Sequence, residues 1–204
     1  MRAVARFFSI VCHPLLLTTY LVLFLGHFFP PMLGINPAVL YKFTLFIFVF
    51  TFAFPALNIV MMVRFSGTLS SLQMASRRER IVPFILISVI YVGITGLFFY
   101  KEILGMNFNR LMAIVAALVL TATVLTFFLK VSVHSLAMGG FVGMLLPMNR
   151  ILADALILPT AIVIILTGVV MSSRLALNAH TLREVVVGVL AGFVVGVAGM
   201  MILF

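Results

Sequence analysis

LMAIVAALVLTATVLTFFL, residues 111–129, contains no charged side chain. An α-helix of about 20 apolar residues is long enough to cross the ~30 Å hydrocarbon core of a bilayer. Apolar residues make up 65% of the 204-residue chain and charged residues 8%, whereas a soluble domain is about half apolar and about a quarter charged. We therefore expect an integral membrane protein.

Similar apolar runs on both sides of this stretch predict six to seven membrane-spanning helices, so the expected fold class is all-α, a polytopic transmembrane helix bundle. A membrane β-barrel would need short segments of alternating polar and apolar residues, and these runs do not alternate. The loops are too short for a soluble domain, which indicates one membrane-embedded domain, residues 1–204. The expected spans lie near residues 7–29, 39–63, 81–100, 110–129, 135–148, 152–171 and 184–204.

The chain carries 13 Lys and Arg against 4 Asp and Glu, a formal charge of +9. Most basic residues stand between apolar runs, where helix ends meet lipid headgroups. The charge therefore favours membrane anchoring or an anionic ligand, and no nucleic-acid partner is expected. Arg2 and Arg6 precede a first apolar run that lacks a small-residue cleavage site, which favours a first span over a cleaved signal peptide.

Three polar segments interrupt the apolar pattern: residues 64–80, 130–134 and 172–183. In the predicted topology two crossings separate each segment from the next. All three segments are therefore expected on one face of the membrane. Arginine, lysine, serine and histidine gathered on one face are typical of an interfacial anion site.

The third segment carries the most specific pattern: Ser173-Arg174, five residues, His180, three residues, Glu184. Composition alone would produce these offsets about once in a thousand sequences, as motif coincidences go. His180 and Glu184 are four residues apart and share a face if helical. A carboxylate there can accept from one imidazole nitrogen and leave the other as a nucleophile.

The other two segments supply groups suited to a phosphate. Lys130, Ser132 and His134 stand together, and His134 could protonate a leaving oxygen. Arginines such as Arg77 and Arg80 donate two hydrogen bonds at once and keep their charge. A dinuclear metal phosphatase would need several carboxylates, and the chain has four acids in total. We therefore expect phosphoryl chemistry with no metal and no cofactor.

At these residues the chain resembles the type 2 phosphatidic acid phosphatases, membrane-embedded lipid phosphatases with a phosphohistidine intermediate. The family's third motif is matched at Ser173, Arg174 and His180, with Glu184 in place of Asp. Its second motif, Pro-Ser-Gly-His, reads VSVH at residues 131–134. Its first motif, Lys, six residues, Arg-Pro, has no counterpart, and RRERIVP at residues 77–83 is the nearest stretch.

The resemblance implies a role for each matched residue. His180 would attack phosphorus, Glu184 would orient it, and His134 would protonate the leaving group. The residues expected to hold the phosphate oxygens are Arg174, Ser132, Ser173 and Arg80, with Arg77 or Lys130 in place of the missing lysine. The substrate would be a lipid phosphate: phosphatidate, phosphatidylglycerol phosphate or a polyprenyl phosphate or diphosphate.

Two other classes of function stay open. The altered first and second motifs also fit a non-catalytic relative, a lipid-binding or structural subunit with a membrane-protein partner. A transporter is disfavoured because no internal repeat is present. The expected location is a bacterial inner (cytoplasmic) membrane. The excess of Lys and Arg favours a cytoplasmic motif face, whereas bacterial relatives commonly face the periplasm.

Several residues have a structural interpretation. Gly188, Gly192 and Gly196 recur every four residues and predict close helix packing, and Gly139, Gly140 and Gly143 could pack in the same way. His13 precedes Pro14 in the first run and is interpreted as structural, bonding backbone groups at a kink.

Overall fold

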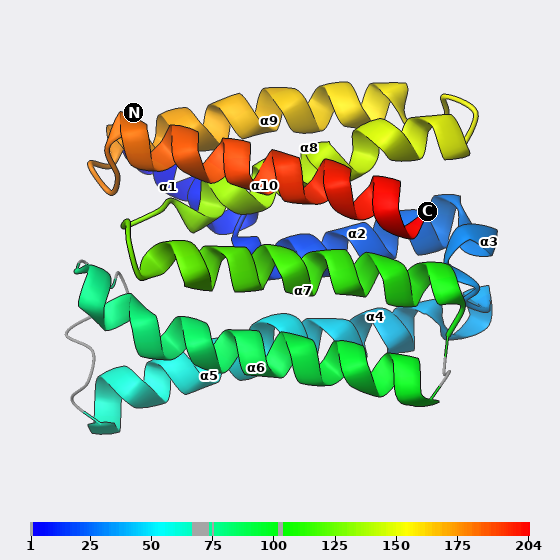
Figure 1. Ribbon diagram of the computed structural model, residues 1–204, viewed down its shortest axis with the longest axis horizontal. Helices are drawn as coiled ribbons and strands as arrows, with labels where there is room; N and C mark the ends of the chain where they lie inside the picture. The colour runs from blue at the N-terminus through cyan, green and yellow to red at the C-terminus, as the bar shows by residue number, and fades with distance from the viewer. Residues whose placement is uncertain (1, 67–73, 75, 102–103) are drawn as a thin grey trace. The chain divides into compact units, whose positions relative to one another are not determined.

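The computed structural model describes residues 2–66, 74, 76–101 and 104–204, and these form helices and no strand. Among them, five helices are long and apolar enough to span a membrane, or six if the broken pair Arg2–Val11 and Pro14–Phe28 counts as one span. The prediction of an all-α membrane protein built as a multi-span helical bundle is confirmed. The longer helices are α1 (Arg2–Val11), α2 (Pro14–Phe28), α4 (Leu40–Phe48), α5 (Phe54–Met61), α6 (Arg77–Lys101), α7 (Met106–Thr126), α8 (Val133–Ile151), α9 (Ile157–Ala176) and α10 (Leu182–Leu203) (Figure 1).

The described chain forms two compact units. We call Met1–Pro14 with Val124–Phe204 the terminal unit, and Leu15–Thr123 the central unit. The expectation of one domain over residues 1–204 stays a prediction. Each unit is described by itself below.

Three of the expected spans differ from the observed helices. The first is broken between Val11 and Pro14, because proline has no amide to donate and disfavours helix at the residue before it. The fifth expected span is the helix α8, but it is not among the apolar spanning candidates. His134, Asn149 and Arg150 lower its hydropathy.

The sixth expected span begins and ends later than predicted. It is α9, Ile157–Ala176, so Ser173 and Arg174 lie on its last turn rather than in a loop. The polar connection to α10 shrinks to residues 177–181.

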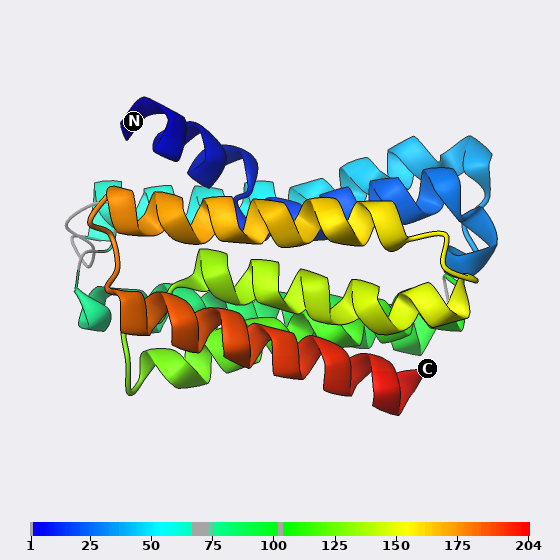
Figure 2. The same cartoon turned by 90° about the horizontal axis from the view of Figure 1, so that it is seen from above.

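In the terminal unit, α8 and α10 pack with their backbones in contact, and Figures 1 and 2 show them side by side. A Cβ on Gly188 would lie 2.7 Å from the Ser132 carbonyl oxygen, and one on Gly192 would overlap the Leu136 carbonyl oxygen. A Cβ on Gly139 would likewise overlap the Val189 carbonyl oxygen. The predicted glycine packing is confirmed, and it holds the first turns of α8 and α10 together.

The other two helices of the terminal unit are α1 and α9. The helix α9 packs against α8, and α1 packs against α9. The α1 residues Ala5 and Ser9 are buried, whereas Arg2 and Arg6 are exposed. The exposed face of α1 thus carries its charges, and its buried face meets the helix that bears Arg174.

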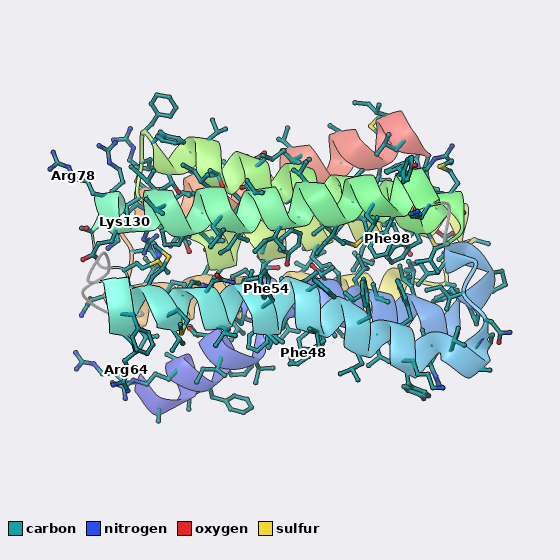
Figure 3. All side chains as sticks on the ribbon, turned by 90° about the horizontal axis from the view of Figure 1, so that it is seen from below. Phe48, Phe54, Arg64, Arg78, Phe98 and Lys130 are labelled. Atoms are coloured by element: carbon teal, nitrogen blue, oxygen red, sulfur yellow. The ribbon has the colours of Figure 1, made fainter. Side chains whose placement is uncertain are left out.

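The central unit contains a continuous helical segment from Pro37 to Phe65, which includes a π-helical turn at Val49–Ala53. The Tyr91 hydroxyl of α6 donates to the Thr51 carbonyl in that turn at 3.1 Å. Figure 3 labels Phe48, Phe54 and Arg64 on this segment. The hydrogen bond from Tyr91 therefore joins α6 to the segment at its π-helical turn.

Candidate functional site

A short turn from α9 to α10 places His180. Asn178 adopts a left-handed conformation, φ +52°, which asparagine tolerates better than most residues. The amides of Leu177 and Ala179 donate to the carbonyls of Ser173 and Arg174, each at 3.1 Å. The chain therefore reverses within five residues and delivers His180 just before α10.

Two acceptors fix the His180 ring. Its Nδ1 lies 3.0 Å from Glu184 Oε2 and 3.2 Å from the Lys130 carbonyl oxygen. A carboxylate and a carbonyl only accept, so Nδ1 carries the proton. The neutral ring then has its lone pair on Nε2. The His180 side chain is 2% exposed and that of Glu184 is 14% exposed, so the pair is largely shielded from water.

Glu184 has a second, structural role. Its Oε2 accepts from the Thr181 amide at 3.1 Å, and its own amide donates to Thr181 Oγ1 at 3.3 Å. This is a capping box for α10, and the sequence Thr181-Leu182-Arg183-Glu184 carries its signature. This capping role was not predicted from the sequence, although the signature was present. Glu184 therefore joins helix capping and histidine orientation in one carboxylate.

Ser132 occupies the N-cap of α8 and is fully buried. Its hydroxyl accepts from Ser135 Oγ at 2.9 Å and from the Ser135 amide at 3.4 Å. Its amide donates to the Glu184 carbonyl at 3.1 Å. These bonds join the starts of α8 and α10 and engage the hydroxyl that the resemblance assigns to phosphate.

His134 has the opposite tautomer to His180. Its Nε2 lies 3.0 Å from the Ser9 carbonyl oxygen, which can only accept, so Nε2 carries the proton and Nδ1 the lone pair. The His13 ring packs edge-on against His134 with centroids 5.3 Å apart. His13 was interpreted as structural, and its ring lies next to the candidate site. The sequence signal was the polar pair Ser9 and His13, four residues apart in an apolar run.

Arg174 approaches the same cluster from α9. Its Nη1 donates to Ser9 Oγ at 3.3 Å, so Ser9 contacts Arg174 through its hydroxyl and His134 through its carbonyl. Arg174, His13 and His180 are each close enough to His134 to interact with it electrostatically. The Arg174 Nε is buried and has no hydrogen-bond partner. A charged group with an unused donor suits an anionic ligand.

The remaining candidates have other surroundings. Lys130 contributes its carbonyl to His180, and Ser173 is buried on α9. Arg77 and Arg80 belong to the central unit, where Arg80 is 7% exposed and its Nε donates to the Met74 carbonyl at 3.0 Å. Their phosphate-binding role stays a prediction. Residues 67–73 and 75 of the first polar segment lie outside the described residues.

The structure brings the second and third polar segments together at one end of the terminal unit. The prediction that all three polar segments lie on one face of the membrane stays a prediction, because the first segment belongs to the central unit. Within the described ranges, no group of three or more His, Cys, Asp or Glu is placed to hold a metal ion. No protein-family model, curated protein or solved structure matches the chain.

Proposed function

We propose that this membrane protein hydrolyses a lipid phosphate, without a metal, through a phosphohistidine at His180. The observation that carries the proposal is the 3.0 Å contact between His180 Nδ1 and Glu184 Oε2. It places the proton on Nδ1 and the lone pair on Nε2, the form in which a neutral imidazole is nucleophilic. Arg174 supplies a cation with an unused donor in the same cluster.

The reaction proceeds in two steps. His180 Nε2 attacks phosphorus, the bond to the leaving oxygen breaks, and that oxygen takes a proton. Water then hydrolyses the phosphohistidine, which releases inorganic phosphate and restores the imidazole. Glu184 stabilises the positive charge on the ring during attack, as an orienting carboxylate does.

His134 is the proposed proton donor to the leaving oxygen. The proton on its Nε2 is bonded to the Ser9 carbonyl. Loss of that proton would leave an imidazolate, so the donated proton is a second one, taken up on Nδ1 when the anionic phosphate binds and passed from Nδ1 to the leaving oxygen. General acid catalysis of this kind contributes about 10²–10⁴-fold.

The proposed substrate reaches the site from the bilayer, and the proposed location is a bacterial inner membrane. The basic site lies where α9 ends and α8 and α10 begin. The ends of membrane helices are where lipid phosphates meet the hydrocarbon region. Phosphatidate, phosphatidylglycerol phosphate and polyprenyl phosphates or diphosphates all present the required group.

A second candidate function is a non-catalytic lipid-binding subunit with a membrane-protein partner. The Ser132 hydroxyl is engaged in the α8 cap, and the Glu184 carboxylate is shared with the α10 cap. A site that has kept these groups for helix capping would bind phosphate without turning it over.

The test is phosphate release by the purified protein from a panel of these lipids with a chelator present. We expect release that continues in chelator and is lost in His180→Ala. Release that stops in chelator would contradict the metal-independent mechanism, and the absence of release by folded protein would favour the binding subunit.

A further inference from the structure

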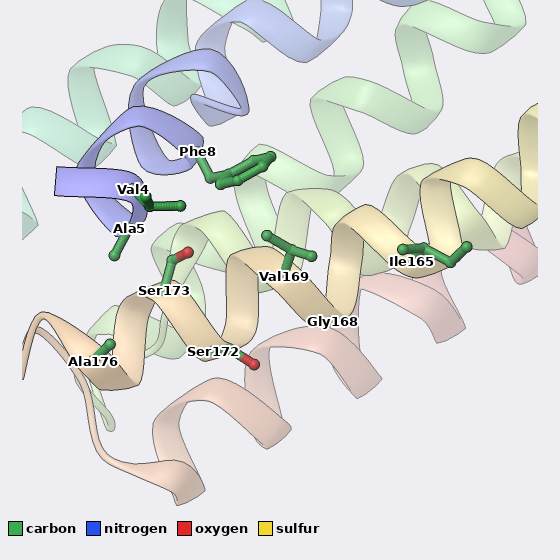
Figure 4. A pocket seen from close by; sticks show the side chains of 9 residues that line it. All are labelled: Val4, Ala5, Phe8, Ile165, Gly168, Val169, Ser172, Ser173 and Ala176. Atoms are coloured by element: carbon green, nitrogen blue, oxygen red, sulfur yellow. The ribbon is translucent and has the colours of Figure 1, made fainter. Parts of the chain in front are cut away.

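A groove of about 560 Å³ lies between α1 and α9 in the terminal unit (Figure 4). Its α1 side is formed by Val4, Ala5 and Phe8, and its α9 side runs from Ile165 to Ala176. Its walls are apolar apart from Ser172 and Ser173. The groove is therefore suited to a hydrocarbon rather than to a polar ligand.

One end of the groove adjoins the candidate site. Ser173 lines it, and the next residue, Arg174, is bonded to Ser9, which follows the groove residue Phe8. Arg174 does not itself line the groove, but it follows Ser173, which does, so a negative charge at this end would lie beside the turn of α9 that carries the Arg174 guanidinium. The apolar part of a molecule in the groove would extend along α9 toward Ile165, which is 67% exposed.

The length of the groove fits half a bilayer. From Ile165 to Arg174, where the headgroup would lie, α9 rises about 14 Å at 1.5 Å per residue. One leaflet of a ~30 Å hydrocarbon core is about 15 Å deep. A single acyl chain, anchored by its headgroup at the end of α9, matches this depth.

Gly168 keeps the middle of the groove open. No heavy atom lies within 4 Å of the position that its Cβ would take, so a larger side chain can enter the space without displacing backbone. Gly96 on α6 in the central unit also has open space at its Cβ position and does not line the groove. The two glycines give a matched pair of variants.

We propose that this groove binds one acyl chain of the lipid phosphate whose headgroup lies at Arg174, so that the site selects long-chain lipids. This proposal rests on the proposed function for the chemistry of the headgroup. It goes further by naming long-chain lipid phosphates as the substrate class and the groove as the binding site of one acyl chain.

The experiment compares wild type, Gly168→Leu and Gly96→Leu on dipalmitoyl and dioctanoyl phosphatidate in the same detergent micelles. We expect kcat/KM for the dipalmitoyl lipid to fall roughly tenfold or more in Gly168→Leu, because several methylene groups lose their contacts. The loss for the dioctanoyl lipid should be smaller, and Gly96→Leu should match wild type. Equal losses for both lipids, or no loss, would overturn the proposal.

A binding measurement separates failure of this inference from failure of the proposed function. Native mass spectrometry of the same three proteins measures retention of dipalmitoyl phosphatidate, with inorganic phosphate as the chain-free probe. Reduced lipid retention in Gly168→Leu alone supports the groove even if no protein hydrolyses lipid. Unchanged retention in that variant overturns the groove even if hydrolysis is observed.

Discussion

On α10, glycines bring a neighbouring backbone into contact, whereas on α9 a glycine borders open space. A Cβ on Gly192 would overlap the Leu136 carbonyl oxygen of α8, but a Cβ on Gly168 would meet no heavy atom within 4 Å. Both helices carry residues of the candidate site at one end. The site thus has one side closed by helix packing and one side open to a ligand.

The two histidines of the site are also held differently. His180, in the turn before α10, donates from Nδ1 to the carboxylate of Glu184. His134, at the start of α8, donates from Nε2 to the Ser9 carbonyl of α1. A carboxylate can stabilise a positive ring and a neutral carbonyl does so less well. This difference supports the proposal that His180 is the nucleophile and that His134 is the proton donor.

The largest effect is expected from Gly192→Leu. Filling a helix contact at backbone distance forces α8 and α10 apart, and overpacking of this kind costs about 1–3 kcal/mol or more. We expect loss of monodisperse protein or a strongly lowered thermal midpoint, measured by size exclusion and thermal unfolding in detergent. A wild-type midpoint in this variant would mean that the two sides do not differ.

The next effect separates the two roles of Glu184. Glu184→Gln keeps the capping box, which accepts glutamine, but removes the negative charge beside His180. We expect phosphate release to fall by about 10²-fold or more with little change in thermal midpoint. A fall in stability without a fall in activity would make Glu184 only a helix cap.

Thr181→Ala is the matched variant for that experiment. It removes the α10 cap and keeps the carboxylate, so stability should fall by about 1 kcal/mol while most activity is kept. Thermal unfolding and phosphate release on the same preparations measure both quantities. Activity losses of equal size in the two variants would contradict separate roles.

A smaller effect is expected from Ser9→Ala. The variant removes the hydroxyl that accepts from Arg174 and keeps the carbonyl that accepts from His134. A hydrogen bond to a charged group contributes about 1.5–3 kcal/mol, and part of this is recovered by an anion bound at Arg174. Stability without ligand should therefore fall more than stability with inorganic phosphate, measured as thermal midpoints with and without phosphate. Equal falls in both conditions would argue against phosphate at Arg174.

The smallest effect is expected from Gly168→Ala. A single methyl group enters open space and replaces glycine in a helix, which raises stability by at most about 1 kcal/mol. The thermal midpoint should stay level or rise slightly. A clear fall would show that Gly168 is a packing glycine like Gly192.

Much of this fold could be predicted because long uncharged runs permit few structures other than helices in a bilayer. The offsets of Ser173, Arg174, His180 and Glu184 predicted that the last two would pair, and the structure joins them at 3.0 Å. The glycine repeat of α10 predicted its contact with α8. These features depend on residues close in sequence or on one helix face.

Other features could not be predicted because they depend on the main chain of distant segments. Ser9 contacts His134 through a carbonyl, and Lys130 contacts His180 in the same way, so neither side-chain type gave a signal. The two histidine tautomers follow from those carbonyls. The break before Pro14 could have been predicted from proline's missing amide, but the long apolar run favoured one continuous span.

The proposed mechanism depends on His180 Nε2 as the nucleophile. The most direct measurement is rapid acid-free quenching of the protein during turnover of ³²P-labelled phosphatidate, followed by mapping of the labelled peptide. We expect an acid-labile phosphate on the peptide that contains His180, at Nε2, with no label in His180→Ala. Label on another residue, or turnover with no labelled intermediate, would contradict it.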